Sequence, residues 1–386
     1  MRLLHIINIG HEAGGAERSV RLIQRGMAAR GHQIRTVATT LGAEGRDVFA
    51  DDLIPAVRGS APRRFLGYLW HRAAHRHLTG IMDEYRPDLV HLHTIGEFSP
   101  SVLAATDRCR RILTLHGPED WTLELLRWNL RSAARGERLS LPDRARYLYL
   151  RFLQRPAYLP RLRRLDRVLA PSAYFADLVR RDVGEVPVHV LPNGVPRTAS
   201  PLPVAETGGL LFVGRLERVK GTHILLDAFR LLLGSHPGAT LDIVGEGTDR
   251  ARLEAAAADL TAAGRVRFTG WLSPTAVRRA LAAASVVVVP SVWPENFPTV
   301  ALEALQCGRP LVASRVGGLP ELVGEDNGVL VPPGDAPALA EALRPLLGDP
   351  HRLRRLGEGS AARAARYDVE HFLDALENHY REVVSR

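Results

Sequence analysis

Two glutamates eight positions apart, Glu295 and Glu303, give the most specific chemical signal in the sequence. Glu295 follows the apolar run Val286–Pro290, so we expect it in a loop at the end of a strand. Glu303 should lie about two turns into the following helix, on the same general side as Glu295. Apolar residues flank Glu303, and a ribose diol that donates hydrogen bonds would satisfy a carboxylate that is otherwise costly to bury. Without such a ligand, Glu295 would be a helix cap and Glu303 a surface residue.

Two cations that follow another apolar run point to a bound anion. The predicted strand Leu210–Val213 ends at Gly214, and Arg215 and Lys220 come directly after it. Two cations at a strand end suit a diphosphate, because the negative charge of this leaving group grows during group transfer. The other interpretation of this stretch is a solvated, charged turn.

The pair Gly14-Gly15 lies between the predicted strand Leu3–Ile9 and the predicted helix Glu17–Arg30. Glycine lets the backbone approach an anion closely, and the N-terminus of a helix favours negative charge. The pair is therefore a candidate for contact with a phosphate or an acceptor. Glycine is also common at strand-to-helix turns that bind nothing.

No group of residues has the spacing of a metal site. The sequence has no Asp-x-Asp motif, and its two cysteines, Cys109 and Cys307, are far apart. We expect His91 and His93, which alternate along one predicted strand, to point to opposite faces of the sheet. Two isolated cysteines are typical of reduced thiols in a cytoplasmic protein. We therefore expect no metal ion, no disulfide and no cofactor.

Short β-branched runs alternate with amphipathic helical patterns along the chain, which predicts parallel sheets covered by helices on both faces. The runs expected to form strands in the first half are Leu3–Ile9, Ile34–Thr39, Leu89–His93, Ile112–Leu115 and Val168–Pro171. Those expected in the second half are Leu210–Val213, Thr240–Val244, Val266–Phe268, Val286–Pro290, Leu311–Ala313 and Val329–Val331. The stretches expected to form helices include Glu17–Arg30, Ile224–Leu233, Arg250–Ala263, Thr299–Gln306 and His371–Val384.

A proline-rich segment, Pro192–Pro203, separates the two halves and has the composition of a linker. We predict one doubly wound α/β domain over residues 1–195 and a second over residues 203–366. Residues 367–386 should form a helix that crosses back to the first domain. Each sheet offers a crevice at the carboxyl ends of its strands, so a ligand in a cleft between the domains could contact both.

The overall composition is that of an ordinary water-soluble protein. The chain has 386 residues, 46% of them hydrophobic and 24% charged, which suffices for two domains that each bury a core. No apolar run approaches the roughly 20 residues of a transmembrane helix. Leu3–Ile9 leads into a glycine-rich loop instead of a cleavage site, so we expect no signal peptide and a cytoplasmic location.

The net charge of +9 is concentrated in one segment, Arg127–Arg167. The segment holds twelve arginines against three acidic residues, and twelve minus three equals the charge of the whole chain. Aromatic and leucine side chains lie between the arginines, which is typical of an interfacial helix on an anionic membrane. The alternative is an arginine-rich insertion that packs on its own domain. No recognised nucleic-acid-binding module accompanies the segment, so we expect no nucleic-acid partner.

Six short motifs occur together in a specific order. They are Leu191-Pro-Asn-Gly-Val195, Gly214-Arg-x4-Lys-Gly221, Val244-Gly-Glu-Gly247, Phe268-Thr-Gly-Trp271, Glu295-x7-Glu303 and Gly317-Gly-Leu-Pro-Glu321. From Gly14 to about Asp335, the chain resembles the family-4 retaining glycosyltransferases. The resemblance implies the GT-B fold, with two Rossmann-like domains and an interdomain cleft. The first domain would bind the acceptor and the second the nucleotide sugar.

The resemblance implies a role for each candidate donor-binding residue. Arg215 and Lys220 would hold the donor diphosphate, and Glu303 would bind the ribose hydroxyls. Glu295 would hydrogen-bond to the donor sugar, and Trp271 would lie near the nucleobase. The full set implied to bind the donor is Gly14, Gly15, Gly214, Arg215, Lys220, Trp271, Glu295, Asn296, Phe297 and Glu303.

The resemblance also implies a catalytic set. His116 matches a family histidine near the donor sugar and phosphate, and it would act together with Arg215, Lys220 and Glu295. We find no carboxylate that is placed to attack the sugar, so we prefer a front-face mechanism with an oxocarbenium-like transition state. The leaving phosphate would then be the base for the acceptor hydroxyl, and the two cations would take the place of a divalent metal ion.

The expected donor is UDP-N-acetylglucosamine or UDP-glucose, because UDP is the common nucleotide of such enzymes. Two positions depart from the family pattern, since Asn296 often corresponds to glycine and Gly117 to aspartate, and these departures bear on the sugar. Proteins of another class, such as sugar epimerases and non-catalytic nucleotide-sugar binders, share the two-domain plan.

Acidic residues in loops of the first half favour a cationic acceptor, such as a small aminocyclitol of antibiotic biosynthesis. They are Glu12, Glu17, Glu97, Glu119 and Asp120. The same acids could simply be solvated. The competing prediction is a lipid-linked acceptor of cell-surface polysaccharide assembly, which the segment Arg127–Arg167 would reach by peripheral contact with the inner membrane face. The sequence indicates no oligomeric state.

Overall fold

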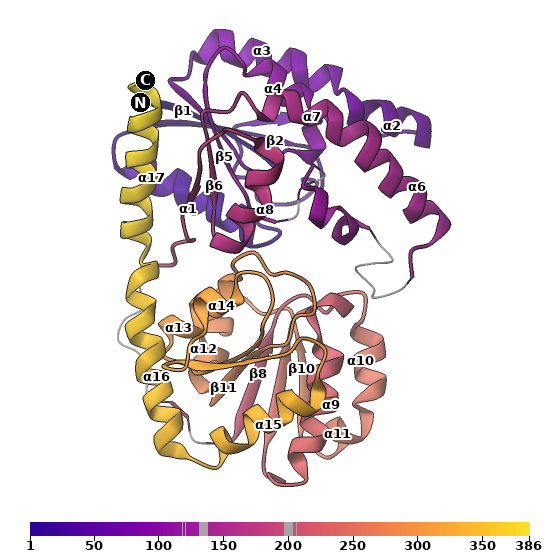
Figure 1. Cartoon of the computed structure of the whole chain (residues 1–386), viewed down its shortest axis with the longest axis vertical. Coiled ribbons are helices and arrows are strands. Elements are labelled where there is room, and N and C mark those ends of the chain that lie inside the picture. Colours follow the sequence, from indigo (N-terminus) through magenta and orange to yellow (C-terminus); the bar gives the residue numbers. More distant parts are fainter. Residues whose placement is uncertain (118, 120, 131–137, 197–203, 206) are drawn as a thin grey trace. The chain divides into compact units, whose positions relative to one another are not determined.

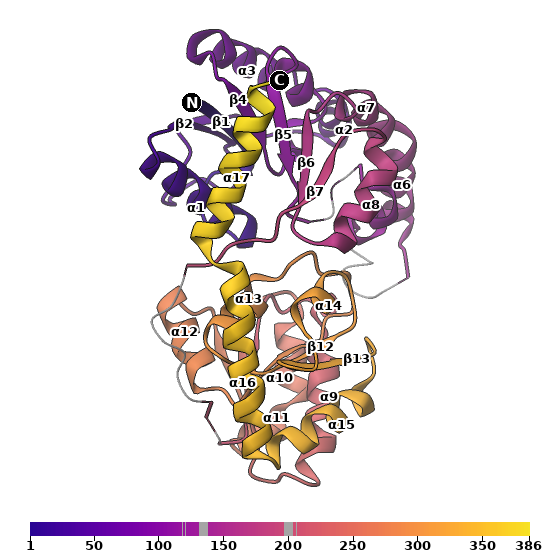
Figure 2. The same ribbon diagram turned by 60° about the vertical axis from the view of Figure 1, so that its left-hand side comes forward.

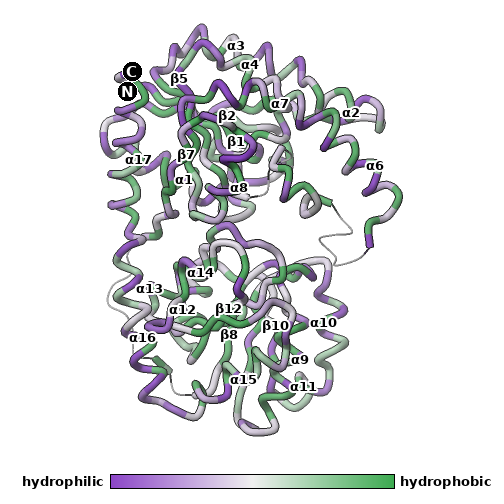
Figure 3. Tube along the Cα trace, viewed as in Figure 1, coloured by the Kyte–Doolittle hydropathy of each residue, from purple (hydrophilic) through white to green (hydrophobic). Residues whose placement is uncertain are grey.

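The computed structural model describes the whole chain except residues 118, 120, 131–137, 197–203 and 206. It divides into two compact units. The first contains the described residues up to Gly194 together with the C-terminal Glu370–Arg386, and the second contains the described residues of Val195–Val369. Each unit is a parallel sheet with helices on both faces (Figure 1). Hydrophobic segments lie mainly along the strands and the inner faces of the helices (Figure 3).

The first unit has a seven-stranded sheet in the order β3-β2-β1-β4-β5-β6-β7, counted over the described residues. Its strands are β1 (Arg2–Ile9), β2 (Gln33–Thr39), β3 (Asp52–Ile54), β4 (Leu89–Leu92), β5 (Arg110–Thr114), β6 (Arg167–Ala170) and β7 (Val188–Val190). Its α-helices are α1 (Gly15–Ala29), α2 (Ala61–Leu69), α3 (Arg72–Tyr85), α4 (Ser101–Ala105), α6 (Leu141–Tyr149), α7 (Arg155–Leu162), α8 (Ala173–Val183) and α17 (Val369–Val384). Shorter helical segments are η1 (Gly96–Phe98), η2 (Leu123–Asn129) and the π-helical η3 (Leu150–Gln154).

The second unit has a six-stranded sheet in the order β10-β9-β8-β11-β12-β13, again over the described residues. Its strands are β8 (Gly209–Val213), β9 (Thr240–Val244), β10 (Val266–Gly270), β11 (Val286–Val289), β12 (Leu311–Ser314) and β13 (Gly328–Val331). Its α-helices are α9 (Thr222–Leu233), α10 (Arg250–Ala256), α11 (Ala258–Ala262), α12 (Pro274–Ala283), α13 (Thr299–Gln306), α14 (Leu319–Leu322), α15 (Ala336–Leu347) and α16 (Pro350–Ala364). The 3-10 turns η4 (Arg218–Lys220) and η5 (Ala365–Tyr367) complete the unit.

Successive apolar side chains along each strand point to alternate faces, which explains why each sheet is buried on both faces. In β8, Leu210 and Phe212 pack with the helices α9 and α15, whereas Leu211 packs with α12 and α13 on the opposite face. Successive side chains of a strand point to opposite faces, so an uninterrupted apolar run fills both cores. Side-chain caps fix several helix starts, and in α15 the carboxylate of Asp335 accepts a hydrogen bond from the Ala338 N–H at 2.8 Å.

The C-terminal helix α17 packs beside α1 in the first unit (Figure 2). Its apolar face buries five side chains, which contribute more stability than surface ion pairs do. These are Phe372, Leu373, Leu376, Tyr380 and Val383. A Cβ added at Gly26 of α1 would lie 2.4 Å from a methyl carbon of Leu373, so glycine permits this close approach of the two helices.

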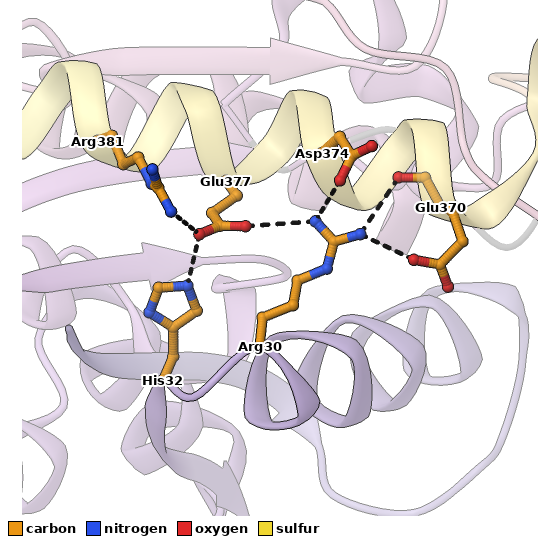
Figure 4. A network of polar contacts seen from close by, with 6 residues as sticks. All are labelled: Arg30, His32, Glu370, Asp374, Glu377 and Arg381. Carbon is orange, nitrogen blue, oxygen red and sulfur yellow. Dashed lines mark hydrogen bonds and ion pairs between the residues drawn. The ribbon is translucent and has the colours of Figure 1, made fainter.

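A polar network runs along the edge of the same helix contact (Figure 4). The Arg30 guanidinium at the end of α1 contacts carboxylates of Glu370, Asp374 and Glu377 at 2.8, 2.6 and 3.3 Å. Glu377 also accepts contacts from His32 at 3.1 Å and from Arg381 at 2.6 Å. The network fixes the register of α17 against the first unit.

The predicted fold class is confirmed, with two doubly wound parallel sheets. All eleven predicted strands are present within one or two residues of the expected bounds. The strands β3 and β7 were not predicted; each has three residues and lies at one edge of the first sheet. The predicted helix Arg250–Ala263 is interrupted at Ala257 and forms α10 and α11. Among the described residues, no helix is both long and apolar enough to cross a membrane.

Candidate functional site

The topological switch point of the second sheet lies between β8 and β11. The chain continues from β8 outward to β9 and β10, and it returns to the other side of β8 with β11, β12 and β13. Doubly wound sheets bind ligands at the carboxyl ends of the strands next to this reversal. The segments that leave these two strands begin at Gly214 and Pro290, and they contain three of the four predicted catalytic residues.

A buried ion pair joins the two segments. Lys220 Nζ lies 2.7 Å from Glu295 Oε1, and the Ser291 hydroxyl donates to the same oxygen at 2.5 Å. The exposed fractions of the Lys220 and Glu295 side chains are 16% and 6%. Burial alone would raise the pKa of Glu295, but the charge and hydrogen bond of Lys220 and the hydrogen bond of Ser291 lower it below its ordinary value. The Lys220 ammonium also lies over the Trp293 ring, 4.8 Å from its centroid.

Close backbone contacts fix the position of this pair. The Val292 N–H donates to the Val219 carbonyl at 2.9 Å, which ties the two segments together. A Cβ added at Gly221 would lie 1.9 Å from the Pro290 carbonyl oxygen, and Gly221 has a left-handed φ of 73°. Any other residue would push the segments apart, and with them Lys220 and Glu295.

A second set of close contacts holds the backbone of Glu295 itself. The Gly318 N–H donates to the Glu295 carbonyl at 2.7 Å. A Cβ added at Gly317 would lie 2.0 Å from the same carbonyl oxygen. Gly245 is packed in the same way against the Gly214 carbonyl, where a Cβ would lie 1.9 Å away. The glycines of these motifs therefore hold the loops of this sheet edge together through their backbones.

The other predicted donor-binding residues of the second unit differ in exposure. Arg215 follows Gly214 and is exposed, and Glu303 is half-buried in the second turn of α13. Asn296 and Phe297 are buried, and the Phe297 ring packs edge-on against Tyr367 with 5.5 Å between centroids. Trp271 directly follows β10, and its side chain is 72% exposed. All of them follow the carboxyl ends of parallel strands.

The first unit places Gly14 and Gly15 at the start of α1, where both are exposed. Gly14 is the N-cap of the helix and offers no side-chain cap to its first N–H groups. Glu17 is buried in the first helical turn, and burial raises the pKa of its carboxyl group.

The predicted acceptor-binding acids lie in the segments that follow β1, β4 and β5. Glu12 forms an ion pair with Arg21 at 2.9 Å, and Glu97 accepts a hydrogen bond from the Tyr68 hydroxyl at 3.2 Å. Glu119 is buried. Asp120 lies outside the described residues. Because β1, β4 and β5 are adjacent and parallel, these segments share one edge of the sheet.

Four histidines form an unpredicted cluster next to this edge. His91 and His93 lie on the same face of the sheet, so the prediction that they point to opposite faces is wrong. Residues two apart on a strand share a face, and the strand register places His5 of β1 beside His91 of β4. His116 follows β5 on the same face and contacts His93.

Hydrogen bonds to described residues occupy six of the eight ring nitrogens of this cluster. His5 Nδ1 lies 3.0 Å from His93 Nε2, and His93 Nδ1 lies 3.1 Å from His116 Nε2. His91 contacts the hydroxyls of Thr114 and Tyr380 at 2.7 and 2.6 Å. Burial lowers the pKa of His5 to about 3 and of His116 to about 4, and it lowers the pKa of His91 and His93 well below the ordinary value.

The ligand atoms of His5, His91 and His93 lie within 4.8 Å of one another, a spacing that a metal ion could use. The donor set does not favour that use, because both nitrogens of His91 and of His93 already have hydrogen-bond partners. A metal ion would have to displace several of these bonds, all of them buried.

The described part of Arg127–Arg167 has a packed end and an exposed part. Tyr158 and Leu162 of α7 pack into the core of the first unit, and Arg155 pairs with Asp182 at 2.5 Å. By contrast, α6, η3 and the neighbouring α2 expose large apolar side chains. These are Leu66, Leu141, Leu148, Phe152 and Leu153. The segment is therefore anchored through α7, and it exposes apolar side chains along α6 and η3.

Comparison with known proteins places both halves of the chain in one class. Residues 13–198 match the family model described as Glycosyltransferase Family 4, and residues 203–363 match the model described as Glycosyl transferases group 1. The 2-deoxystreptamine N-acetyl-D-glucosaminyltransferase of Streptomyces fradiae is 33% identical over 317 residues, which cover 78% of this chain and 72% of that protein.

Two further similar proteins differ in how much of their length the match covers. The glycogen synthase of Mycobacterium tuberculosis is 37% identical over 212 residues, 53% of this chain and 50% of the synthase, so the match spans about half of that relative. The crystal structure of Anabaena HepE in complex with UDP and glucose superposes with a TM-score of 0.71 at 20% identity. That comparison covers 99% of this chain and 100% of HepE, and at this identity it supports the fold.

Proposed function

The chain belongs to glycosyltransferase family 4, and from this premise we propose that it transfers a hexose or N-acetylhexosamine, with retention, from a nucleotide diphosphate sugar to an acceptor hydroxyl. The observation that carries the proposal is the buried pair of Lys220 and Glu295 at the switch point of the second sheet. Arg215 lies at the same sheet edge and is exposed to a ligand.

The chemistry assigned to these residues follows from their charge and placement. Lys220 and Arg215 would stabilise the diphosphate as negative charge develops on it during bond cleavage. Glu295 would accept a hydrogen bond from a hydroxyl of the donor sugar through the carboxylate oxygen that Lys220 leaves unused. Glu303 would accept hydrogen bonds from the ribose diol. The leaving phosphate oxygen would take the proton of the acceptor hydroxyl, which attacks on the same face of the sugar.

We propose UDP-N-acetylglucosamine as the donor, with UDP-glucose as the second candidate. The Streptomyces fradiae relative is named an N-acetyl-D-glucosaminyltransferase, and HepE was crystallised with UDP and glucose. The exposed Trp271 offers a flat apolar surface at the end of β10 on which a uracil base could stack.

We propose a small cationic aminocyclitol as the acceptor. The Streptomyces fradiae relative is named for 2-deoxystreptamine, and the loops that follow β1, β4 and β5 carry Glu12, Glu97 and Glu119. Glu97 is the best placed of these acids, because its N–H is held by the Asn8 side chain at 3.0 Å and its carboxylate is oriented by Tyr68. Ammonium groups of an aminocyclitol would pair with such an oriented carboxylate.

A lipid-linked acceptor is the second candidate, favoured by the exposed apolar side chains of α2, α6 and η3. Arginines lie among them, including Arg144 and Arg151, so this surface combines insertion into a lipid interface with attraction to anionic headgroups. Under this alternative the enzyme would work at the inner face of the cytoplasmic membrane.

An acceptor assay with UDP-N-acetylglucosamine distinguishes the two candidates. We expect UDP release to accelerate with 2-deoxystreptamine and to be unaffected by vesicles of anionic phospholipid. The Glu97→Gln variant should raise KM for 2-deoxystreptamine about tenfold, as expected for the loss of one charge-assisted hydrogen bond. The matched control is Glu84→Gln, because Glu84 is an exposed acid that precedes β4 at the other edge of the sheet. Acceleration only by a vesicle-borne polyprenyl acceptor would favour the lipid alternative, and an equal KM in both variants would contradict the role of Glu97.

A further inference from the structure

We propose that His5 and His93 are positioning residues that hold His116 in a single tautomer, with its proton on Nδ1. The effect of this tautomer on catalysis rests on the proposed function, in which His116 would contact the sugar or phosphate of the donor. The tautomer itself follows from the first unit alone.

The three imidazoles form a continuous chain that leads from the interior of the unit to its carboxyl edge. His5 and His93 are fully buried, and His116 is half-buried at the outer end. The two nitrogen–nitrogen distances, 3.0 and 3.1 Å, are those of hydrogen bonds. The rings of His5 and His93 are nearly parallel, with 13° between their planes. Among the described residues, none forms a hydrogen bond with His116 Nδ1, the nitrogen at the outer end of this series.

The number of protons on the three imidazoles allows only two directions for the two hydrogen bonds that join them. Burial keeps all three imidazoles neutral at pH 7, so each carries one N–H. In the outward orientation His5 donates to His93, and His93 donates to Nε2 of His116. In the inward orientation both bonds are reversed. The proton of His116 therefore lies on Nδ1 in the outward orientation and on Nε2 in the inward one.

The inner end of the chain favours the outward orientation. His5 Nε2 is buried without a hydrogen-bond partner among the described residues. It would carry an unpaired N–H in the inward orientation and only a lone pair in the outward one. Unpaired buried N–H groups are rarer in proteins than under-satisfied acceptors. His5 therefore donates toward His93, and the orientation is transmitted to His116.

A fixed tautomer decides what His116 can do. With its proton on Nδ1, His116 is a hydrogen-bond donor toward an oxygen of the donor substrate, and it cannot act there as a base. Such a neutral donor can stabilise a hydroxyl or phosphate oxygen without adding a positive charge. His91 is a natural control, because it is equally buried and packs on His93. Its hydrogen bonds go to Thr114 and Tyr380, so it does not belong to the series of hydrogen bonds that joins His5, His93 and His116.

The direct test is the tautomer of His116 in the wild-type protein. Long-range proton–nitrogen correlation on protein with 15N-labelled histidine distinguishes the protonated ring nitrogen from the bare one, and the His116→Gln variant assigns the signals. We expect Nδ1 of His116 to be protonated at pH 7.5 and Nε2 to be bare. A proton on Nε2, or averaging between both tautomers, would overturn the proposal, and neither result depends on turnover.

Variants of His93 test whether its hydrogen bonds are what fixes the tautomer of His116. His93→Phe keeps a ring but removes both hydrogen bonds, so His116 should exchange between tautomers, and kcat should fall about tenfold with KM for the donor nearly unchanged. His93→Asn places a side-chain amide nitrogen near the former position of His93 Nδ1, from which it can donate a hydrogen bond to His116 Nε2. This variant should restore the single tautomer and most of kcat. His91→Gln should leave the tautomer of His116 unchanged. An unchanged tautomer in His93→Phe would contradict the proposal. Should that variant not fold, the wild-type spectrum and His93→Asn decide the question. If the wild-type protein binds no nucleotide sugar, the proposed function is wrong, but the tautomer measured for His116 still tests the present proposal.

Discussion

Replacing Lys220 by alanine will lower kcat about 100-fold or more and will reduce the free energy of unfolding by about 3 kcal/mol. The activity falls because the diphosphate loses a cation where its charge develops. The stability falls because Glu295, whose side chain is 6% exposed, is left without its counter-charge. Steady-state kinetics and urea unfolding of the purified variant measure the two effects.

A second substitution separates these two consequences. In Lys220→Ala/Glu295→Gln the buried carboxylate is replaced by a neutral amide, so most of the lost stability should return while kcat stays low. The matched control is Arg218→Ala, which removes a cation from the same turn, η4, and should change kcat less than twofold. Recovery of kcat in the double variant would show that Lys220 acts only through Glu295, which contradicts its assignment to the diphosphate.

The second large effect is a loss of stability on mild acidification, caused by the four clustered histidines. Their pKa values are about 3 for His5, about 4 for His116 and well below 6.5 for His91 and His93. In the unfolded chain each has its ordinary pKa of 6.5 and takes up a proton as the pH falls below that value. Because only the unfolded state binds these protons, the stability is present above pH 6.5 and declines as the pH falls from 6.5 to about 3.

The expected slope is large compared with the stability of a protein domain. Below about pH 5.5, where the unfolded histidines are almost fully protonated, each one contributes about 1.4 kcal/mol per pH unit to the slope, so four contribute about 5.5 kcal/mol per unit. The total stability of a typical domain is about 5–15 kcal/mol. Urea unfolding of the full chain at pH 7.5, 5.5 and 4.5 measures this slope. His91→Gln should reduce the slope by about 1.4 kcal/mol per pH unit, since that variant lacks one of the titrating groups. The same slope in wild type and variant would contradict the neutral cluster.

The sequence predicted the sheets well because their strands are buried on both faces. Val286–Val289, for example, is an uninterrupted β-branched run that fills two cores at once. The edge strands Asp52–Ile54 and Val188–Val190 escaped prediction because three residues at a sheet edge carry no such pattern.

The candidate site could be predicted only in part, because it depends on contacts between distant segments. The sequence placed Lys220 and Glu295 at strand ends, but their pairing across 75 positions depends on Gly221 and Gly317, which admit close backbone contacts. The histidine cluster depends on the register between β1 and β4, which brings His5 beside His91. No local pattern encodes such a register.

The central claim is that the carboxyl edge of the second sheet binds a nucleotide diphosphate, and ligand-induced stabilisation tests it most directly. The unfolding free energy of wild type and of Arg215→Ala should be measured with UDP, GDP, ADP and TDP added separately. We predict that UDP at 100 times its Kd stabilises wild type by about 2.7 kcal/mol, and that the effect is largely lost in Arg215→Ala. Stabilisation by no nucleotide, or equal stabilisation of wild type and variant by UDP, would contradict the account.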